Sequence, residues 1–175
     1  SELLGATDSV NPKTSWLLLD VALFDSKRLR SLIRSLDWTA SSALYGSSLE
    51  RFGEHAPHLV ELGGNINTVT EGLRRLFAID PSAPGISLIH CATGLAALQR
   101  LCGYMALSRI DKDLLVHCRF ADTRVLPNLL DALSEAQLAR LSVDIARWCW
   151  IDYRGEVKCW QHHLSSSGNK QIDLA

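Results

Sequence analysis

The chain has 175 residues, of which 47% are hydrophobic and 21% are charged. That length fits a single domain, and about 70% of the surface of the unfolded chain can be buried at this size. The 18 Lys and Arg residues nearly balance the 19 Asp and Glu residues, so the net charge is −1. Proteins that bind nucleic acid usually carry a clear basic excess. The composition therefore excludes a largely disordered chain and predicts no nucleic-acid partner.

The cysteines and the hydropathy bear on the cellular compartment. The chain contains five cysteines, Cys91, Cys102, Cys118, Cys149 and Cys159. An odd count without any C-x-x-C pair predicts buried free thiols in a reducing compartment rather than a disulfide framework. We find no signal-peptide pattern and no apolar run of membrane-spanning length, so we expect a cytoplasmic protein without a membrane partner. Because the sequence begins with Ser1 and not Met, we also expect a processed or trimmed start.

The first apolar run, from residue 15 to residue 24, contains a single acid, Asp20, and predicts a buried strand. Apolar residues at helical spacing follow between residues 26 and 36, which predicts a helix. The opposite face of this helix carries four basic residues, Lys27, Arg28, Arg30 and Arg34. We interpret this face as solvated, with phosphate binding as the less favoured alternative.

The next segment, residues 37–57, has no regular pattern, and residues 57–62 predict a short strand. A capping box made by Thr68 and Glu71 predicts the start of a second helix. Pro81 lies past the end of that helix.

The central part of the chain repeats the alternation. Residues 85–91 are strand-like, and Thr93 is expected to cap a helix that extends to Met105. Residues 113–120 predict another strand. A leucine-rich helix is expected over 126–133, since its leucines recur at helical spacing.

The last elements are a short helix and a hairpin. Ser134 and Gln137 form a second capping box. Two strands, 146–152 and 156–162, are then predicted to join in a turn around Gly155.

Strands that alternate with helices and end in a hairpin predict an α/β fold. We expect a single layered domain, residues 1–175, with a mixed β-sheet flanked by helices. Its core spans about residues 15–164, and the polar segment 165–175 is expected to be a frayed tail.

Two His-Cys dipeptides are the strongest candidates for catalysis or metal binding. His90-Cys91 and His117-Cys118 each lie in a predicted strand, and neighbouring strands would bring them together. Successive side chains of a strand point to opposite faces, so neither dipeptide can supply both halves of one site. Glycine-rich phosphate loops, a nucleophile elbow and metal-ligand spacings are absent from the sequence. We therefore expect no cofactor, no metal and no catalytic residue. A small hydrolase or transferase that uses Cys118 or Cys91 with a histidine is the alternative.

A cluster of charges lies between the strand at 113–120 and the leucine-rich helix. Asp122 and Thr123 fall where a helix N-cap belongs, and Pro127 is tolerated only in the first helical turn. Arg119 and Arg124 flank Asp122 and can pair with it. We predict an ion-paired structural joint at these residues. The functional alternative is that the arginines receive a partner.

This segment closely resembles the signature of the type VI secretion effector adaptors, also called effector chaperones. The family's hallmark is an apolar strand that ends in Arg-Phe-x-Asp-Pro-Arg-Val-Leu and is followed by a leucine-rich helix. The matching residues are Arg119, Phe120, Asp122, Arg124, Val125 and Leu126, with Thr123 in place of the usual proline. The segments WLLLDVAL, APHLVEL and ARWCWID are similar to three further strands of the family, so the resemblance covers nearly the whole chain.

The resemblance implies a non-enzymatic role in the cytoplasm of a Gram-negative bacterium. Such adaptors hold a toxic effector protein and load it onto the spike protein of the secretion machine. Arg119 and Arg124 are candidate contacts with a partner. Trp148 and Trp150 share one strand face, where they either pack in the core or anchor a partner.

Overall fold

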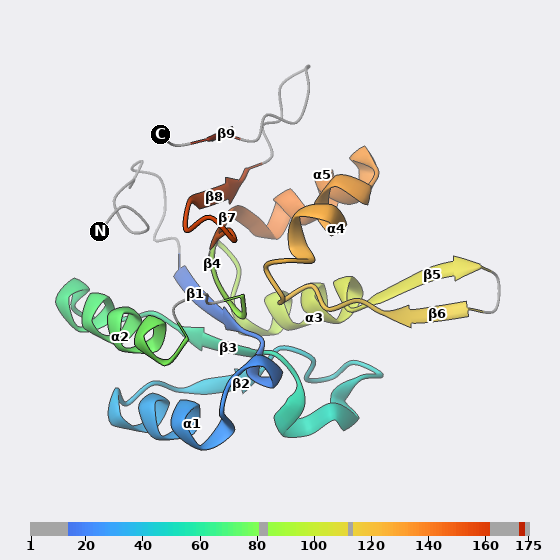
Figure 1. The fold of residues 1–175 in the computed structure, drawn as a ribbon. Helices are drawn as coiled ribbons and strands as arrows, with labels where there is room; N and C mark the ends of the chain where they lie inside the picture. The colour runs from blue at the N-terminus through green and yellow to red at the C-terminus, as the bar shows by residue number, and fades with distance from the viewer. Residues whose placement is uncertain (1–13, 81–83, 112–113, 162–171, 174–175) are drawn as a thin grey trace.

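The computed structural model describes residues 14–80, 84–111, 114–161 and 172–173. The α/β fold is confirmed. A central sheet has α1 and α2 on one side and α3, α4 and α5 on the other (Figure 1). Among the described residues, no helix has both the length and the apolar character that crossing a membrane requires.

The main sheet has the strand order β2-β3-β1-β4-β7-β8-β9. Its strands are β1 (Thr14–Leu19), β2 (Ala40–Ser42), β3 (His58–Glu61), β4 (Ile86–Cys91), β7 (Ile145–Ile151), β8 (Val157–Trp160) and the two-residue β9 (Ile172–Asp173). The helices are α1 (Ser26–Ser35), α2 (Ile66–Ile79), α3 (Leu95–Met105), α4 (Leu126–Ala132) and α5 (Glu135–Asp144), with short 3-10 turns η2 (Val21–Leu23) and η3 (Glu50–His55). Two further strands, β5 (Leu107–Asp111) and β6 (Leu114–His117), form a separate pair.

Every strand pairing described is antiparallel, so the prediction of a mixed sheet was wrong. The physical reason lies in the crossovers. The strands β3 and β4, which α2 connects, run in the same direction, but β1 lies between them. The strands β1 and β2, which α1 connects, also run in the same direction and have β3 between them. The crossover through α1 therefore passes over β3, and the crossover through α2 passes over β1.

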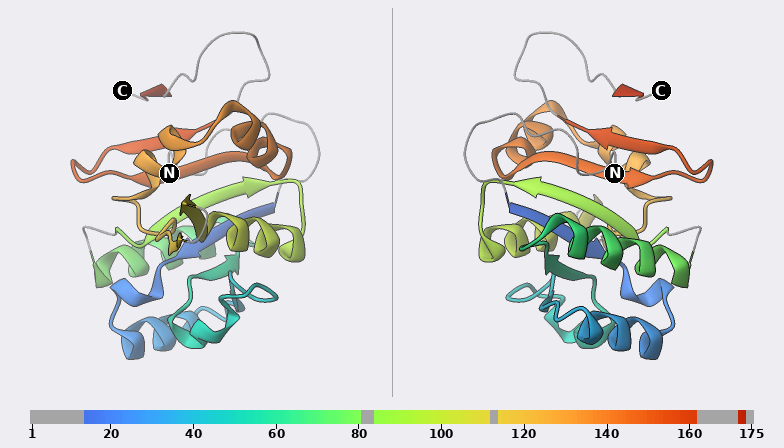
Figure 2. Two further views of the ribbon diagram at one scale, coloured as in Figure 1. Left: turned by 90° about the vertical axis from the view of Figure 1, so that its right-hand side faces the viewer. Right: turned by 90° about the vertical axis from the view of Figure 1, so that its left-hand side faces the viewer.

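The two faces of the sheet bury two separate hydrophobic clusters. Leu17 and Leu19 of β1 pack with the apolar stripes of α1 and α2. Trp16 and Leu18, which point the other way, pack with α3, α4 and α5. The side views in Figure 2 show the strands stacked one above another, with the β7–β8 hairpin toward the opposite edge from β2. Because successive side chains of β1 point to opposite faces of the sheet, this one strand contributes to both hydrophobic clusters.

The β7–β8 hairpin turns at Gly155, as predicted, where the backbone has a φ of 81° that glycine tolerates. Cys149 and Cys159 lie directly opposite each other in this hairpin and form a disulfide. The prediction of free thiols was wrong for this pair, because antiparallel pairing joins residues that no short sequence spacing connects. The other three cysteines, Cys91, Cys102 and Cys118, are free.

Two predicted helix caps differ from those in the structure. The helix α2 starts at Ile66, where the side chain of Asn65 accepts the backbone N–H of Asn67, so Thr68 lies inside the helix. The carboxylate of Glu71 binds the Arg74 guanidinium instead of a cap (2.8 and 2.9 Å). The helix α3 starts after Gly94 without a side-chain cap, although Thr93 was expected to supply one.

The capping box of Ser134 and Gln137 is present at the start of α5. The expected position of Pro81 beyond α2 lies outside the described residues, and so does the expected tail 165–175 apart from β9.

The strand predicted at 113–120 is not part of the main sheet. Its regular part, β6, pairs with β5 in a separate two-stranded sheet, which projects from the end of α3 as an arm (Figure 1). The chain leaves the arm after His117 and returns to the body through residues 118–125. That returning segment contains the charged cluster.

Candidate functional site

The returning segment is anchored to the body by its own backbone and by apolar side chains. The N–H of Cys118 donates to the carbonyl of Ala106 at 2.8 Å, and the N–H of Thr123 donates to the carbonyl of Pro84 at 2.7 Å. Phe120, with 0% of its surface exposed, fills the core beside α3 and α4. These contacts hold the charged residues on either side of Phe120 in fixed positions.

Arg119 links this segment to the end of β1. Its Nη2 lies 2.8 Å from Oδ2 of Asp20, a residue 99 positions earlier in the chain. The Asp20 side chain is only 5% exposed, whereas the Arg119 side chain is 44% exposed. Asp20 also accepts the backbone N–H of Ala22 at 3.3 Å and so caps the short turn η2. One acid therefore fixes a turn and receives an arginine from a distant part of the chain.

Asp122 and Arg124 form the second pair of the cluster. Nε and Nη2 of Arg124 donate to the two oxygens of Asp122 at 2.9 and 2.7 Å, and the backbone N–H of Arg124 donates at 3.0 Å. Arg119 lies 3.9 Å from the same carboxylate. Both arginines thus contact Asp122, as the sequence predicts. Burial alone would raise the pKa of Asp122, but the bonds from Arg124 hold that pKa below its ordinary value.

Thr123 and Pro127 complete the joint. Thr123 is 5% exposed, and Pro127 lies in the first turn of α4, where a missing N–H costs nothing. The helix proper has Val125 at its N-cap position without a side-chain bond, so Asp122 caps the turn before α4 and not the helix itself. The carbonyl of Asp122 accepts the N–H groups of Val125 and Leu126, both at 2.9 Å. The turn therefore leads directly into the helix.

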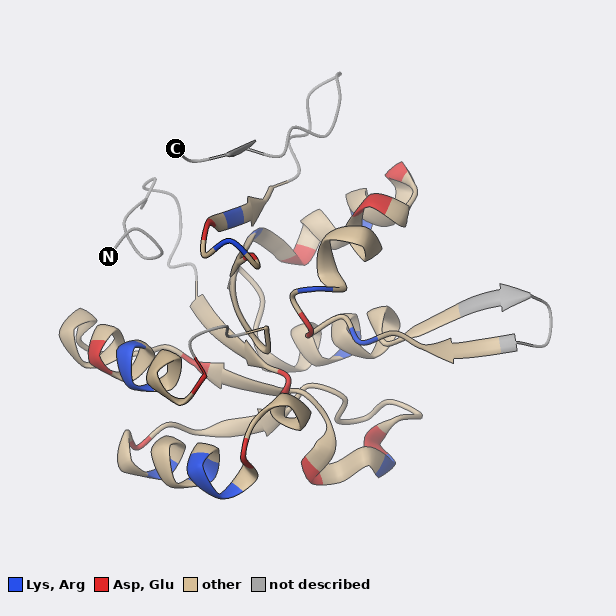
Figure 3. Cartoon of the chain, viewed as in Figure 1, with Lys and Arg blue, Asp and Glu red and all other residues tan. Residues whose placement is uncertain are grey.

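The cluster pairs two buried carboxylates with two arginines that reach solvent. The side chain of Arg124 is 60% exposed and that of Asp122 is 3% exposed. Figure 3 shows acidic and basic segments side by side where the chain returns from the arm toward α4. The unused donors of Arg119 and Arg124 can face a partner, while the carboxylates below them fix the two guanidinium groups. These donors can bond to a polar or acidic group.

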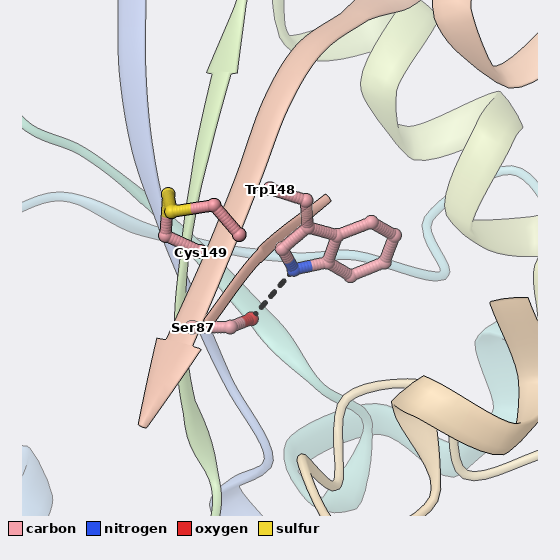
Figure 4. The surroundings of a disulfide bond; sticks show 4 residues. Ser87, Trp148 and Cys149 are labelled. Atoms are coloured by element: carbon pink, nitrogen blue, oxygen red, sulfur yellow. Dashed lines mark hydrogen bonds between the residues drawn. A yellow bond between two sulfur atoms is a disulfide. The ribbon is translucent and has the colours of Figure 1, made fainter. Parts of the chain in front are cut away.

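The two tryptophans that the sequence proposed as partner anchors lie in the core. Trp148 is 1% exposed and Trp150 is 3% exposed, so of the two alternatives only core packing is seen. The indole Nε1 of Trp148 donates to Oγ of Ser87 at 2.9 Å. Figure 4 shows this bond, with Trp148 and Cys149 on opposite sides of β7. Neither indole is available to a partner at the surface.

The two His-Cys dipeptides do not come together. His90-Cys91 lies in β4 of the main sheet, whereas His117-Cys118 lies at the end of the arm strand β6. Nδ1 of His90 bonds to Oγ of Ser15 (2.9 Å), and the ring of His117 packs against Phe52. Within the described ranges, no group of three or more His, Cys, Asp or Glu side chains is placed to hold a metal ion.

The buried thiols are not activated. Burial raises the pKa of the Cys91 thiol, and it raises the pKa of Cys102 to about 12. A nucleophilic cysteine needs the opposite shift, because the thiolate is the reactive form. The Sγ of Cys118 lies 3.1 Å from Oγ of Ser108, a contact with a hydroxyl and not with a base.

Sequence reasoning missed Asp20 as a member of the cluster. The signal was present, because Asp20 is the only acid in an apolar run and a buried acid needs a partner. The sequence does not reveal which of its 18 basic residues supplies that partner.

The chain matches the model of a known protein family. A family model described as a domain of unknown function, DUF4123, matches residues 15–140. The matched range includes all of β1 except Thr14, together with Asp20 and the whole charged cluster, and it ends within α5. No curated protein and no solved structure is significantly similar to the chain.

Proposed function

The chain belongs to the DUF4123 family, and on that premise we propose that it is a non-enzymatic adaptor for type VI secretion. In this proposal it binds a toxic effector in the cytoplasm of a Gram-negative bacterium and helps to load it onto the spike protein. The observation that carries the proposal is the resemblance of residues 119–126 to the adaptor signature, which lies inside the matched range.

The geometry of the signature supports a binding role. Its apolar residues, Phe120 and Leu126, are fully buried, so they fix the position of the segment. Its two arginines keep 44% and 60% of their side chains exposed beside their carboxylate partners. Residues that are both exposed and rigidly held are suited to recognition, because binding then orders few side chains.

The protonated state of the buried thiols supports a non-enzymatic role. Cys91 and Cys102 have raised pKa values, and the two His-Cys dipeptides lie in different sheets. An enzyme that used one of these cysteines would need a thiolate and a neighbouring base. The proposal predicts that alkylating reagents leave these thiols unmodified in the folded protein.

The proposed location bears on the hairpin disulfide. Cytosolic proteins are normally kept reduced. A cytoplasmic adaptor would therefore carry Cys149 and Cys159 as adjacent thiols, and these would close to the disulfide on oxidation. Counting the free thiols after the cells are rapidly acidified, which stops thiol exchange, would show whether the disulfide or the two thiols are present.

Co-purification tests the adaptor proposal directly. The chain would be co-expressed with the tagged N-terminal segment of the toxin encoded beside it, and with the corresponding spike protein. We expect stable association with the toxin segment. If neither protein co-purifies with the folded chain, the adaptor proposal is wrong.

Variants of the cluster separate recognition from folding. Arg124→Ala removes the more exposed arginine, and Arg140→Ala, on α5, removes an exposed arginine elsewhere as a matched control. If the cluster contacts the effector, Arg124→Ala weakens capture while Arg140→Ala does not. Equal capture by both variants would assign Arg124 a purely structural role.

A further inference from the structure

The two helices on one side of the sheet enclose a groove between them. It has a volume of about 460 Å³ and is open to solvent. Positions 28, 31, 32 and 35 of α1 line one wall, and positions 74, 75, 78 and 79 of α2 line the other. Each set recurs at helical spacing, so the groove follows the line where the two helices lie side by side.

The groove has an apolar floor and a polar rim. Leu32, which is 7% exposed, and the partly buried Ile79 form the floor. Ser31 and Ser35 of α1 supply hydroxyl groups at the rim. The open hollow therefore combines a small apolar surface with polar and charged groups at its rim.

The two helices that form the groove carry a net positive charge, although the net charge of the whole chain is slightly negative. The helix α1 carries four basic residues and no acid, and α2 carries two arginines and one acid. The two helices therefore contribute five net positive charges in a chain whose total is −1. Figure 3 shows the basic segments of α1 and α2 on these neighbouring helices. The field at the groove attracts anions.

The arginines at the groove differ in their partners. Arg74 is bound by both oxygens of Glu71, so its charge is balanced. Arg75 donates to the hydroxyl of Ser35 at 3.0 Å, and within the described part of the chain no carboxylate lies within ion-pair distance of Arg75 or Arg28. Arg28 lies in the first turn of α1, where the Asp25 carboxylate accepts its backbone N–H at 2.9 Å and offsets the positive end of the helix dipole, so the positive field here comes from the basic side chains.

We propose that this groove binds an acidic, extended segment of a partner polypeptide, with carboxylates held by Arg28 and Arg75. Because Arg75 bonds to Ser35, the two arginines lie near positions 28 and 35 of α1, which are seven residues and therefore about 10 Å apart along the helix axis. An extended chain rises about 3.3 Å per residue, so acidic residues three positions apart match that spacing. The proposal rests on the adaptor role only in taking the partner to be a protein.

A synthetic peptide tests the groove without knowledge of the partner. The probe is a fluorescein-labelled glycine peptide with glutamate at every third position, and the control peptide has glutamine in place of glutamate. We expect the full chain to bind the glutamate peptide, and Arg28→Gln combined with Arg75→Gln to weaken binding by about tenfold or more. Fluorescence anisotropy at physiological salt measures both affinities.

Two charges of α1 that do not line the groove give the matched control. Lys27→Gln combined with Arg34→Gln removes two positive charges, as the test variant does, and neither residue has an ion pair within the described part of the chain. We expect this control to weaken binding by no more than about threefold, because only the general field changes. Equal weakening by the two double variants would overturn the proposal, and so would equal binding of the glutamine peptide. Tighter binding of an oligothymidylate at the same salt would assign the groove to nucleic-acid phosphates and would also overturn it.

The outcomes of this test and of co-purification are independent. An effector that co-purifies equally with the Arg28 and Arg75 double variant and with the unaltered chain would leave the adaptor proposal standing and remove the groove from it. Conversely, a groove that binds the acidic peptide in a chain that captures no effector would refute the adaptor role alone.

Discussion

Replacing Arg119 with alanine should destabilise the protein by about 2 kcal/mol. Within the described residues, the substitution leaves the Asp20 carboxylate, whose side chain is 5% exposed, with one hydrogen bond, from the N–H of Ala22 at 3.3 Å. Removing one partner from a fully buried pair costs about 3–5 kcal/mol, and removing one from an exposed pair costs about 0–1 kcal/mol. Because Arg119 itself is 44% exposed, water screens part of the interaction, and an intermediate value follows.

Urea denaturation followed by tryptophan fluorescence measures this loss, since buried Trp148 and Trp150 report the core. The control is Arg30→Ala, which removes an ion pair with Glu54 at nearly the same distance, 2.7 Å, but with side chains 51% and 68% exposed. We expect the control to lose less than about 0.5 kcal/mol. A similarly small loss of stability for Arg119→Ala would show that the burial of Asp20 does not strengthen the contribution of this ion pair.

Three further predictions concern other parts of the fold. Because the pKa of Asp122 is lowered in the folded protein, its ionised form stabilises the fold. This stabilisation is complete above the ordinary aspartate pKa and is lost as the pH falls through the lowered pKa. Acid unfolding of Arg124→Ala should therefore begin at a higher pH than that of the unaltered protein. Gly72→Ala should destabilise by about 1–3 kcal/mol despite better helix propensity, because its Cβ would meet Cη2 of Trp38 at 2.7 Å; a stabilised variant in thermal melts would contradict this. Reduction of the Cys149–Cys159 disulfide, which closes a loop of ten residues, should lower the free energy of unfolding by about 2.5 kcal/mol, whereas a variant with serine at both positions should not respond to reductant.

The sequence predicted local elements well because their signals are local. The apolar spacing of α1, the capping box at Ser134 and the turn at Gly155 all act within a few residues, and each appears where it was expected. The cap of α2 was misplaced because Asn65, three residues before Thr68, accepts the N–H of Asn67 and starts the helix at Ile66. Two cap candidates in one segment compete, and spacing alone does not rank them.

The contacts between distant residues could not be predicted in the same way. The sequence proposed the pairing of Arg119 and Arg124 with Asp122, which lies two to three residues away, but not the pairing of Arg119 with Asp20. The disulfide could have been found, because Cys149 and Cys159 are equally distant from the centre of the predicted hairpin. Strand order was beyond reach, because the choice of neighbours depends on the tertiary packing of α1 and α2.

The interlocked crossovers have a consequence for synthesis of the chain on the ribosome. The strand β1 is made first, yet one of its two neighbours, β4, is completed only at Cys91. The two strands that α1 connects do not pair with each other, because β3 lies between them, and the two that α2 connects have β1 between them. Neither crossover can therefore complete its part of the sheet without the other. We therefore expect that β1 to β4 do not fold one after another. They should fold together, and become resistant to protease in a single step, once β4 has emerged. A nascent chain that ends before β4 leaves the apolar edge of β1 open to other chains.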